Sequence, residues 1–198
     1  MKDRTDFLSQ AWYTLARAIA EAGVNADMDR TPETITKSLN RQVRAELKRL
    51  AILLRRLIFL MALQMDLAPT AVRPGRNYHA PKKETSEYRY TFTILPAASR
   101  PCPHFLKGPV TVPHRGPVPA APLIARWQAM LDTMKHHKRR ARRLARTIQR
   151  WRAAGDARPH VVPIPKTHRM SAALGLVSGG LTVKLIEALK AWPEPDTG

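Results

Sequence analysis

Two long stretches of the chain carry apolar residues at heptad spacing, and we expect each to form a helix. In the first, about residues 32–67, the apolar positions step by four and three: Val43, Leu47, Leu50, Leu54, Leu57 and Met61. In the second, about residues 122–153, they step by three and four: Trp127, Met130, Met134, His137, Ala141, Leu144, Ile148 and Trp151. Each helix would be about 50 Å long at about 1.5 Å per residue. Matched lengths and matched apolar stripes predict a long antiparallel helical hairpin.

The first of these helices has sequence signals at both ends. Thr31 is expected to be its N-cap, Pro32 its first helical residue, and Pro69 its end. Its middle is apolar nearly all round, since further apolar residues lie outside the stripe: Ile52, Leu53, Ile58, Phe59, Leu60 and Leu63. We therefore expect other elements to cover it on more than one side.

Shorter helices at the two ends of the chain are the candidates for this cover. The stretch "DFLSQAWYTLARAIAEAG" repeats apolar residues every three or four positions and ends at Gly23. Near the other end, "LTVKLIEALKAW" follows Ser178-Gly179-Gly180, which we interpret as an interhelical turn. The predicted fold is therefore mainly α, with the long hairpin packed against shorter N- and C-terminal helices in a three- or four-helix bundle.

Between the two long helices the chain is rich in proline. Of the 17 prolines, 11 fall between Pro69 and Pro122. "EYRYTFTIL" (87–95) alternates in the manner of a strand, and "PVTV" (109–112) is its expected mate in a small β ribbon. "HVVPIP" (160–165) is a third short extended piece. We divide the chain into segments 1–68, 69–121, 122–155 and 156–198 and expect them to make one compact domain.

The charge of the chain indicates that this helical bundle is a binding protein. The 198 residues include 34 Lys and Arg against 15 Asp and Glu, which leaves a net charge of +19. The excess is largest in segment 119–158, with 11 basic and 2 acidic residues. So large an imbalance makes a polyanion the expected partner.

The positive charge is concentrated on the second long helix. No acidic residue occurs from Thr133 to Gly155, although helix faces usually mix signs because like charges at i,i+4 repel. We expect a polyanion-binding face made of Lys135, Lys138, Arg139, Arg140, Arg142, Arg143, Arg146, Arg150 and Arg152. A solvated helix face without a ligand is the alternative interpretation.

Nucleic acid, DNA or RNA, is the expected polyanion. Lys and Arg would contact phosphates, and base reading is not indicated because no helix-turn-helix, zinc-finger, RRM or KH signature accompanies the basic helix. Trp127 and Trp151 lie on the apolar stripe, so we expect them in the core rather than stacked on bases. An adaptor contacting acidic protein surfaces, and a peripheral membrane protein that uses the apolar Leu57–Met65 region, are the alternatives.

Catalytic and metal signatures are missing from the sequence. It contains no GxSxG, P-loop or HExxH motif, so we expect no enzyme and no cofactor. Cys102 and the scattered histidines lack the spacing of a zinc site. The uncharged Leu57–Met65 segment is too short to span a bilayer, so we expect no transmembrane segment and a cytoplasmic protein. Heptad stripes also pair between chains, which makes a homo-oligomer possible.

Overall fold

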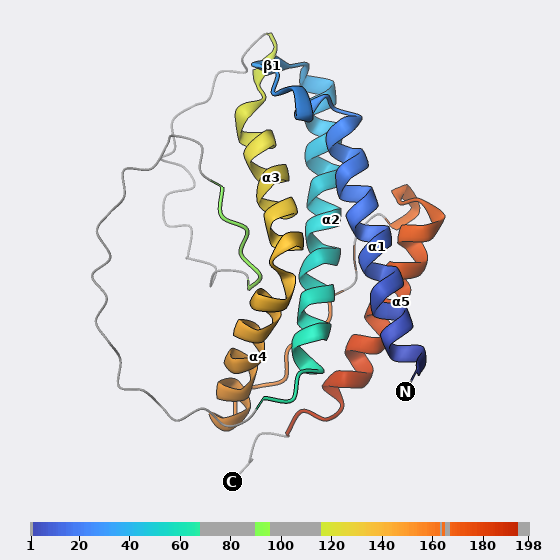
Figure 1. Cartoon of the computed structure of the whole chain (residues 1–198), viewed down its shortest axis with the longest axis vertical. Coiled ribbons are helices and arrows are strands. Elements are labelled where there is room, and N and C mark those ends of the chain that lie inside the picture. The colour runs from blue at the N-terminus through green and yellow to red at the C-terminus, as the bar shows by residue number, and fades with distance from the viewer. Residues whose placement is uncertain (1, 68–89, 96–115, 163, 165–166, 194–198) are drawn as a thin grey trace, which may run out of the picture.

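The computed structural model describes residues 2–67, 90–95, 116–162, 164 and 167–193 (Figure 1). This part of the chain forms five α-helices: α1 (Lys2–Val24), α2 (Lys37–Leu63), α3 (Ala121–Lys135), α4 (His137–Ala153) and α5 (Ala172–Leu189). It also contains two short 3-10 helices, η1 (Met28–Arg30) and η2 (Thr167–Arg169), and two short strands, β1 (Thr34–Ile35) and β2 (Val118–Pro119). The mainly α fold expected from the sequence is confirmed.

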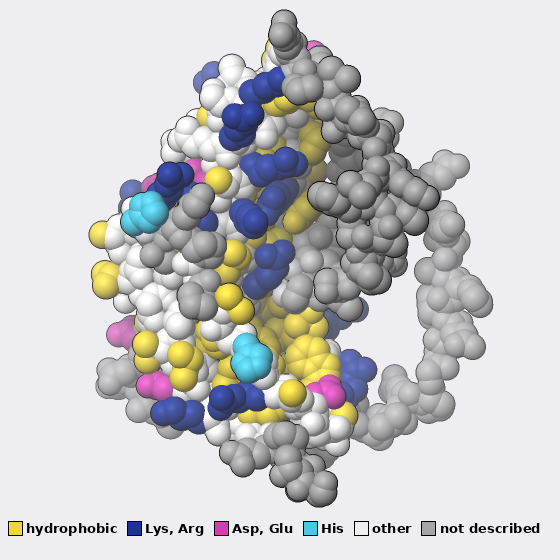
Figure 2. All heavy atoms as spheres, turned by 180° about the vertical axis from the view of Figure 1, so that it is seen from behind, with side chains coloured by type: hydrophobic (Ala, Val, Ile, Leu, Met, Phe, Trp, Pro, Cys, Tyr) yellow, Lys and Arg dark blue, Asp and Glu magenta, His cyan; other side chains and the backbone are white. Residues whose placement is uncertain are grey.

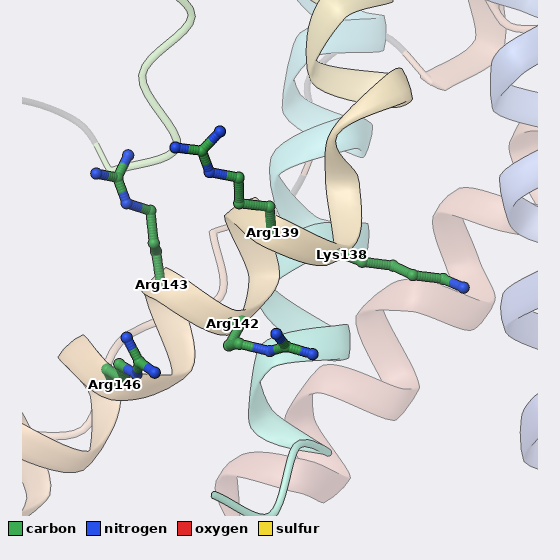
Figure 3. A pocket seen from close by; sticks show the side chains of 5 residues that line it. All are labelled: Lys138, Arg139, Arg142, Arg143 and Arg146. Atoms are coloured by element: carbon green, nitrogen blue, oxygen red, sulfur yellow. The ribbon is translucent and has the colours of Figure 1, made fainter. Parts of the chain in front are cut away.

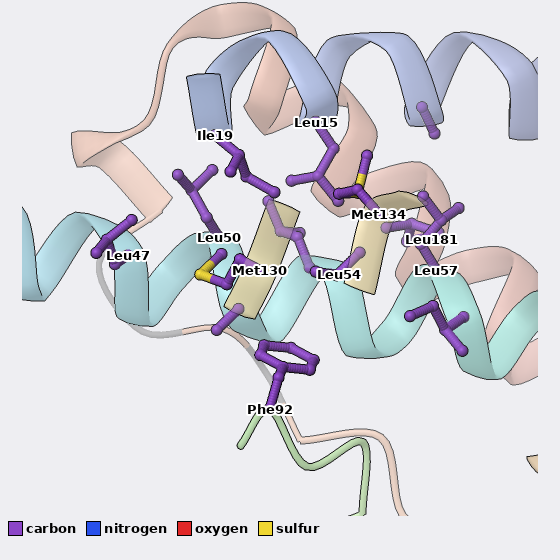
Figure 4. Close-up of a cluster of buried hydrophobic side chains, with 14 of the residues drawn as sticks. Leu15, Ile19, Leu47, Leu50, Leu54, Leu57, Phe92, Met130, Met134 and Leu181 are labelled. Carbon is purple, nitrogen blue, oxygen red and sulfur yellow. The ribbon is translucent and has the colours of Figure 1, made fainter. Parts of the chain in front are cut away.

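Helix α2 is the centre of the structure. It contacts α1, α3, α4 and α5 (Figure 1). Its apolar side chains are buried on several sides, and those with no exposed surface are Leu47, Leu53, Leu54, Leu57, Ile58 and Leu60. Figure 4 shows side chains of α2 meeting residues from three other helices: Leu15 and Ile19 of α1, Met130 and Met134 of α3, and Leu181 of α5. Both terminal helices therefore cover α2, as its all-round apolar surface predicted.

The two long helical stretches run in the same direction, so the predicted antiparallel hairpin is wrong. β1 precedes α2 and pairs with β2, which precedes α3, with Thr34 opposite Pro119. At the far end, the side-chain amide of Gln149 in α4 donates to the Leu67 carbonyl at 2.9 Å. Heptad stripes pack in either direction, and only a short connection forces neighbouring helices to be antiparallel. Residues 64–120 are long enough to return along α2, which spans about 40 Å.

The second long stretch is not one continuous helix but two, which meet at His136. The Nδ1–H of His136 donates to the Asp132 carbonyl at 3.0 Å, and that of His137 donates to the Met134 carbonyl at 2.8 Å. The backbone N–H of His136 still donates to the Asp132 carbonyl at 3.0 Å, and the break lies in the backbone of His136 itself, whose φ of −105° and ψ of 22° are not helical. The apolar stripe continues across the break, and the His137 ring packs on Trp12 with centroids 4.0 Å apart.

Helix α2 begins later than its sequence signals predicted. Its N-cap is Thr36, whose hydroxyl accepts a hydrogen bond from the Leu39 backbone N–H at 3.3 Å. Thr31, the predicted cap, instead has φ +48° and ends η1 by donating its N–H to the Met28 carbonyl. Pairing of β1 with β2 holds residues 34–35 in extended conformation, so the helix starts only after them.

Helix α5 begins before the glycine pair that we interpreted as an interhelical turn. Ser171 is its N-cap, and the helix continues through Ser178, Gly179 and Gly180. A Cβ on Gly180 would stand 2.5 Å from Cε2 of Phe7 in α1. The glycine therefore permits the close approach of two helices rather than a change of chain direction, and the turn interpretation is wrong.

Helix α5 also has the length and apolarity of a membrane span. Its 18 residues have a mean hydropathy of 1.5, and 28% of them are buried in the structure. Leu176, Val183 and Ile186 expose 79%, 55% and 49% of their surface. The core helix of a soluble protein passes the same test of length and composition, so this is weak evidence for a membrane. The Leu57–Met65 region exposes little apolar surface that could contact a membrane, because Leu57, Ile58 and Leu60 are buried.

A pair of glycine substitutions tests the course of α5 and the packing of α1. Gly179→Ala should raise the free energy of unfolding by about 0.5–1 kcal/mol, because a Cβ there meets nothing within 4 Å and alanine favours the helix. Gly23→Ala should lower it by about 1–3 kcal/mol, because the Cβ would stand 2.2 Å from the Trp127 ring. Urea unfolding of both variants measures the difference. Destabilisation by Gly179→Ala would contradict a helix through this position.

Candidate polyanion-binding surface

Packing against α2 decides which side of α4 faces solvent. Four residues of α4 are buried, with at most 4% of their surface exposed: Ala141, Leu144, Ala145 and Ile148. Side chains follow each other at about 100° around a helix, so these four occupy one side and the opposite side is left to other residues. The basic residues of the sequence fall on that opposite side, and α4 therefore presents them to solvent.

Seven of the nine predicted site residues form this exposed surface, which we call the α4 face. They are Lys135, Lys138, Arg139, Arg142, Arg143, Arg146 and Arg150. Five of them, 138, 139, 142, 143 and 146, line an open cavity of about 470 Å³ (Figure 3). In that view Arg139 and Arg143 point to one side of the helix, and Lys138 and Arg142 point to the other. The charge is thus spread around the helix, which suits an extended anion better than a small one.

The other two predicted residues, Arg140 and Arg152, have partners within the protein. Arg140 binds Asp132, with its Nη2 2.9 Å from Oδ2, and donates from Nη1 to the Phe92 carbonyl at 3.2 Å. The Arg152 guanidinium lies over the Trp192 ring, 5.0 Å from its centroid. Both side chains are partly buried, so we assign them to structure and leave them out of the α4 face.

Arginines also hold the segment that the sequence predicted as a strand. Arg55 of α2 donates from Nε to the Thr93 carbonyl at 2.8 Å, and its guanidinium lies over the buried Phe92 ring. Arg55 and Arg140 therefore donate to the Thr93 and Phe92 carbonyls, which in a ribbon would accept hydrogen bonds from a second strand. Residues 90–95 form no strand, and the other parts of the predicted ribbon, 87–89 and 109–112, lie outside the described residues.

Asp132, an exposed acid near the end of α3, is paired with two residues of the protein itself. The hydrogen bond from Arg140 lowers the pKa of Asp132 below its ordinary value of 3.8, and the charges of His136 and Arg140 act in the same direction. Its carboxylate binds His136 and Arg140, both at the junction of α3 and α4. Since no acid follows in α4 itself, the α4 face keeps its full positive charge.

Sequence analysis missed a second group of cations, which we call the α2 row. It consists of Lys37, Arg41, Arg44, Lys48 and Arg55. Figure 2 shows Lys and Arg side chains gathered in a column down the back of the molecule, where α2 lies. The net charge of residues 1–67 is small because acids elsewhere in that segment offset the cations of α2. Helix α2 itself contains only one acid, Glu46. Counting charge by helix face would have found it.

Two further arginine interactions attach α2 to its neighbours. Arg56 donates from Nη1 to the Thr182 hydroxyl of α5 at 3.1 Å and from Nη2 to the Val162 carbonyl. Burial lowers the pKa of Arg55 and of Arg56, but a guanidinium remains charged at neutral pH. Arg56 therefore serves the packing of α2 against α5 and the segment before it.

Comparisons with protein-family models, curated proteins and solved structures find no match to this chain. The part of the chain that the structure describes contains no group of three or more His, Cys, Asp or Glu residues placed to hold a metal ion. Cys102, His79, His104 and His114 lie outside it. The functional argument therefore depends on the charge and geometry of the basic surfaces.

The pKa of Asp132 tests the ion pair at the helix junction. We expect carboxyl NMR titration to place it below 3.8, and Arg140→Gln to return it toward that value. Folding lowers the pKa of Asp132, so the ion pair stabilises the folded protein at every pH above the ordinary pKa of a carboxyl group. This stabilisation is lost as the pH falls through the lower pKa of the folded state. For an exposed pair it amounts to about 0.2–1 kcal/mol. Arg139→Gln is the control and should leave the pKa of Asp132 unchanged.

Proposed function

We propose that this protein binds nucleic acid without sequence specificity through the α4 face, in a role that involves no catalysis. The observation that carries the proposal is the absence of acid among seven exposed cations, six on α4 and Lys135 at the adjoining end of α3. These cations extend from Lys135 to Arg150, about 22 Å at 1.5 Å per residue. A duplex of that length presents about 13 phosphates, at one per about 1.7 Å. Each strand of such a duplex carries about half of these phosphates, a number close to that of the cations on the α4 face.

The types of side chain on the α4 face favour contacts to phosphate over contacts to bases. Five of its residues are arginines, whose planar guanidinium can donate two hydrogen bonds to one phosphate. Amide side chains, which read adenine by paired hydrogen bonds, are missing from the face. Gln149 of α4 is half-buried and is bound to the Leu67 carbonyl. Binding through phosphates alone gives affinity without sequence preference.

Repulsion within the face also favours an anionic partner. Pairs such as Lys138 and Arg142, or Arg139 and Arg143, stand at i,i+4, where like charges destabilise a helix by a few tenths of a kcal/mol each. Phosphates placed between them would remove this cost. Binding would also release counterions from the nucleic acid, which makes the affinity fall with salt.

A salt series with purified, nuclease-treated protein tests the proposal. Fluorescent duplex DNA of random sequence should bind with an affinity that falls linearly on a log–log plot, by about 0.9 for each phosphate contacted. Changing Arg139, Arg142, Arg143 and Arg146 to Ala should weaken binding and reduce the slope by up to about 3.6. Arg140 is left unchanged because its replacement would also release residues 90–95.

The control variant removes the same amount of charge elsewhere on the exposed surface. It changes Arg30, Arg158, Arg169 and Lys190 to Ala, all exposed and outside the α4 face. We expect this variant to keep most of the affinity and slope. An equal loss in both variants would show that net charge, and not the α4 face, determines binding. Weak binding by the wild type would contradict the proposal and favour an acidic protein partner.

Association with anionic membranes is a second candidate function, which the exposed apolar side chains of α5 favour. Leu176, Val183 and Ile186 could enter a bilayer surface while the positive net charge attracts anionic headgroups. Vesicles of phosphatidylserine and phosphatidylcholine should then bind the wild type, and changing these three residues to Ser should abolish flotation with the vesicles. Duplex binding should not change in this variant. Wild-type protein that does not float with vesicles would contradict this function.

A further inference from the structure

The α2 row places four cations on successive turns from Lys37 to Lys48 and a fifth, Arg55, two turns further along the helix. Its members follow each other at steps of four, three, four and seven residues, which place all five within about 60° of the helix circumference at about 100° per residue. From Lys37 to Arg55 the row extends about 27 Å at about 1.5 Å per residue. Arg41, Arg44 and Lys48 are exposed, whereas Lys37 and Arg55 are half-buried and Arg55 also donates to the Thr93 carbonyl. The row is therefore as long as the α4 face but offers fewer exposed cations, namely Arg41, Arg44 and Lys48.

No acid of α2 compensates this row. Glu46, the acidic residue of α2, is nine positions from Lys37 and Arg55, which places it about half a circumference away. At the C-terminal end of the row, α3 adds a further cation, Arg126. Its guanidinium lies over the Tyr90 ring, 5.8 Å from the ring centroid. The surface is thus basic across two helices.

The α2 row and the α4 face are separate surfaces that point in different directions. α4 turns its buried residues toward α2, so the α4 face looks away from α2. Between the two surfaces lies segment 90–95, which accepts hydrogen bonds from both sides, from Arg55 at Thr93 and from Arg140 at Phe92. Duplex DNA is stiff, with a persistence length of about 150 base pairs, so a duplex lying along one surface does not bend around this edge to the other.

We propose that the α2 row is a second phosphate-binding surface, and that the protein bridges two duplexes by holding one on each surface. This inference rests on the function proposed for the α4 face. Seven exposed cations on one surface, and on the other the exposed Arg41, Arg44 and Lys48 with the half-buried Lys37, give each duplex its own set of phosphate contacts, while Arg55 holds segment 90–95. The protein also places positive charge between two duplexes that would otherwise repel each other.

A capture experiment with the full chain tests this bridging. One duplex is fixed to beads, protein is added and excess removed, and a second, fluorescent duplex is then offered. Wild type should retain the fluorescent duplex on the beads. Changing Arg41, Arg44 and Lys48 to Gln should preserve binding to the first duplex and reduce capture of the second about tenfold or more. The matched control changes three exposed cations elsewhere, Arg30, Arg158 and Lys190, to Gln and should capture as wild type does.

The outcomes separate this inference from the function on which it rests. Capture by the α2-row variant at the wild-type level overturns the inference, because bridging would then come from another surface or from pairing of two protein chains. Binding of one duplex without capture of a second by the wild type also overturns it and leaves the α4 function standing. If the α4-face variant binds the bead duplex as tightly as wild type, the proposed function of the α4 face fails. Circular dichroism melting confirms that each variant is folded.

Discussion

Burial of the C-terminal half of α2, residues 50–62, on nearly every side is the constraint on which the rest of the structure depends. Its leucines and isoleucines lie at more positions than one partner helix could cover, so α1, α3, α4 and α5 all pack against it. Burying each such side chain contributes about 1.5–3 kcal/mol, so leaving any side of α2 uncovered would be costly. The N-terminal half, residues 37–49, differs because only Val43 and Leu47 are buried there, and most of the α2 row lies on its uncovered side. The arrangement of the helices thus follows from the apolar surface of α2. The position of the second basic surface follows from the part of α2 that the other helices leave uncovered.

The position of the α4 face is a consequence of the same packing. Ala141 and Ala145 are small, which lets α4 lie close to α2, while Leu144 and Ile148 fill the space beside them. With this side fixed, every cation on the opposite side is held at the surface of a rigid helix. Only the side chains, and not the backbone, would lose freedom when these cations bind phosphates, so a packed basic helix is a better binding surface than a basic tail of the same composition. Stability and the proposed function therefore use opposite sides of one helix.

Arginine has two different roles in this protein, and the difference lies in what each guanidinium meets. Arg55, Arg56 and Arg140 donate to carbonyls of segments that have no other regular partner, and Arg152 covers the Trp192 ring. A planar group with five N–H donors can satisfy such carbonyls and stack on rings while it stays charged. The remaining cations of α4 find no acid on their helix and point to solvent. A single run of basic sequence therefore contains both residues that hold the fold and residues of the proposed binding surface.

The sequence by itself determined the helical elements, the apolar stripes, the need to cover α2 with α1 and α5, and the basic side of α4, because these depend on a periodicity of 3.6 residues that is local to each helix. Tertiary structure decided the rest. The common direction of α2 and α3 depends on the pairing of Thr34 with Pro119, far apart in the chain. The break at His136 leaves the apolar stripe unbroken, and the glycine at 180 gives room for the Phe7 ring rather than a turn. Whether Arg140 binds a ligand or Phe92 is likewise set by what folding brings beside it, and no local pattern contains that information.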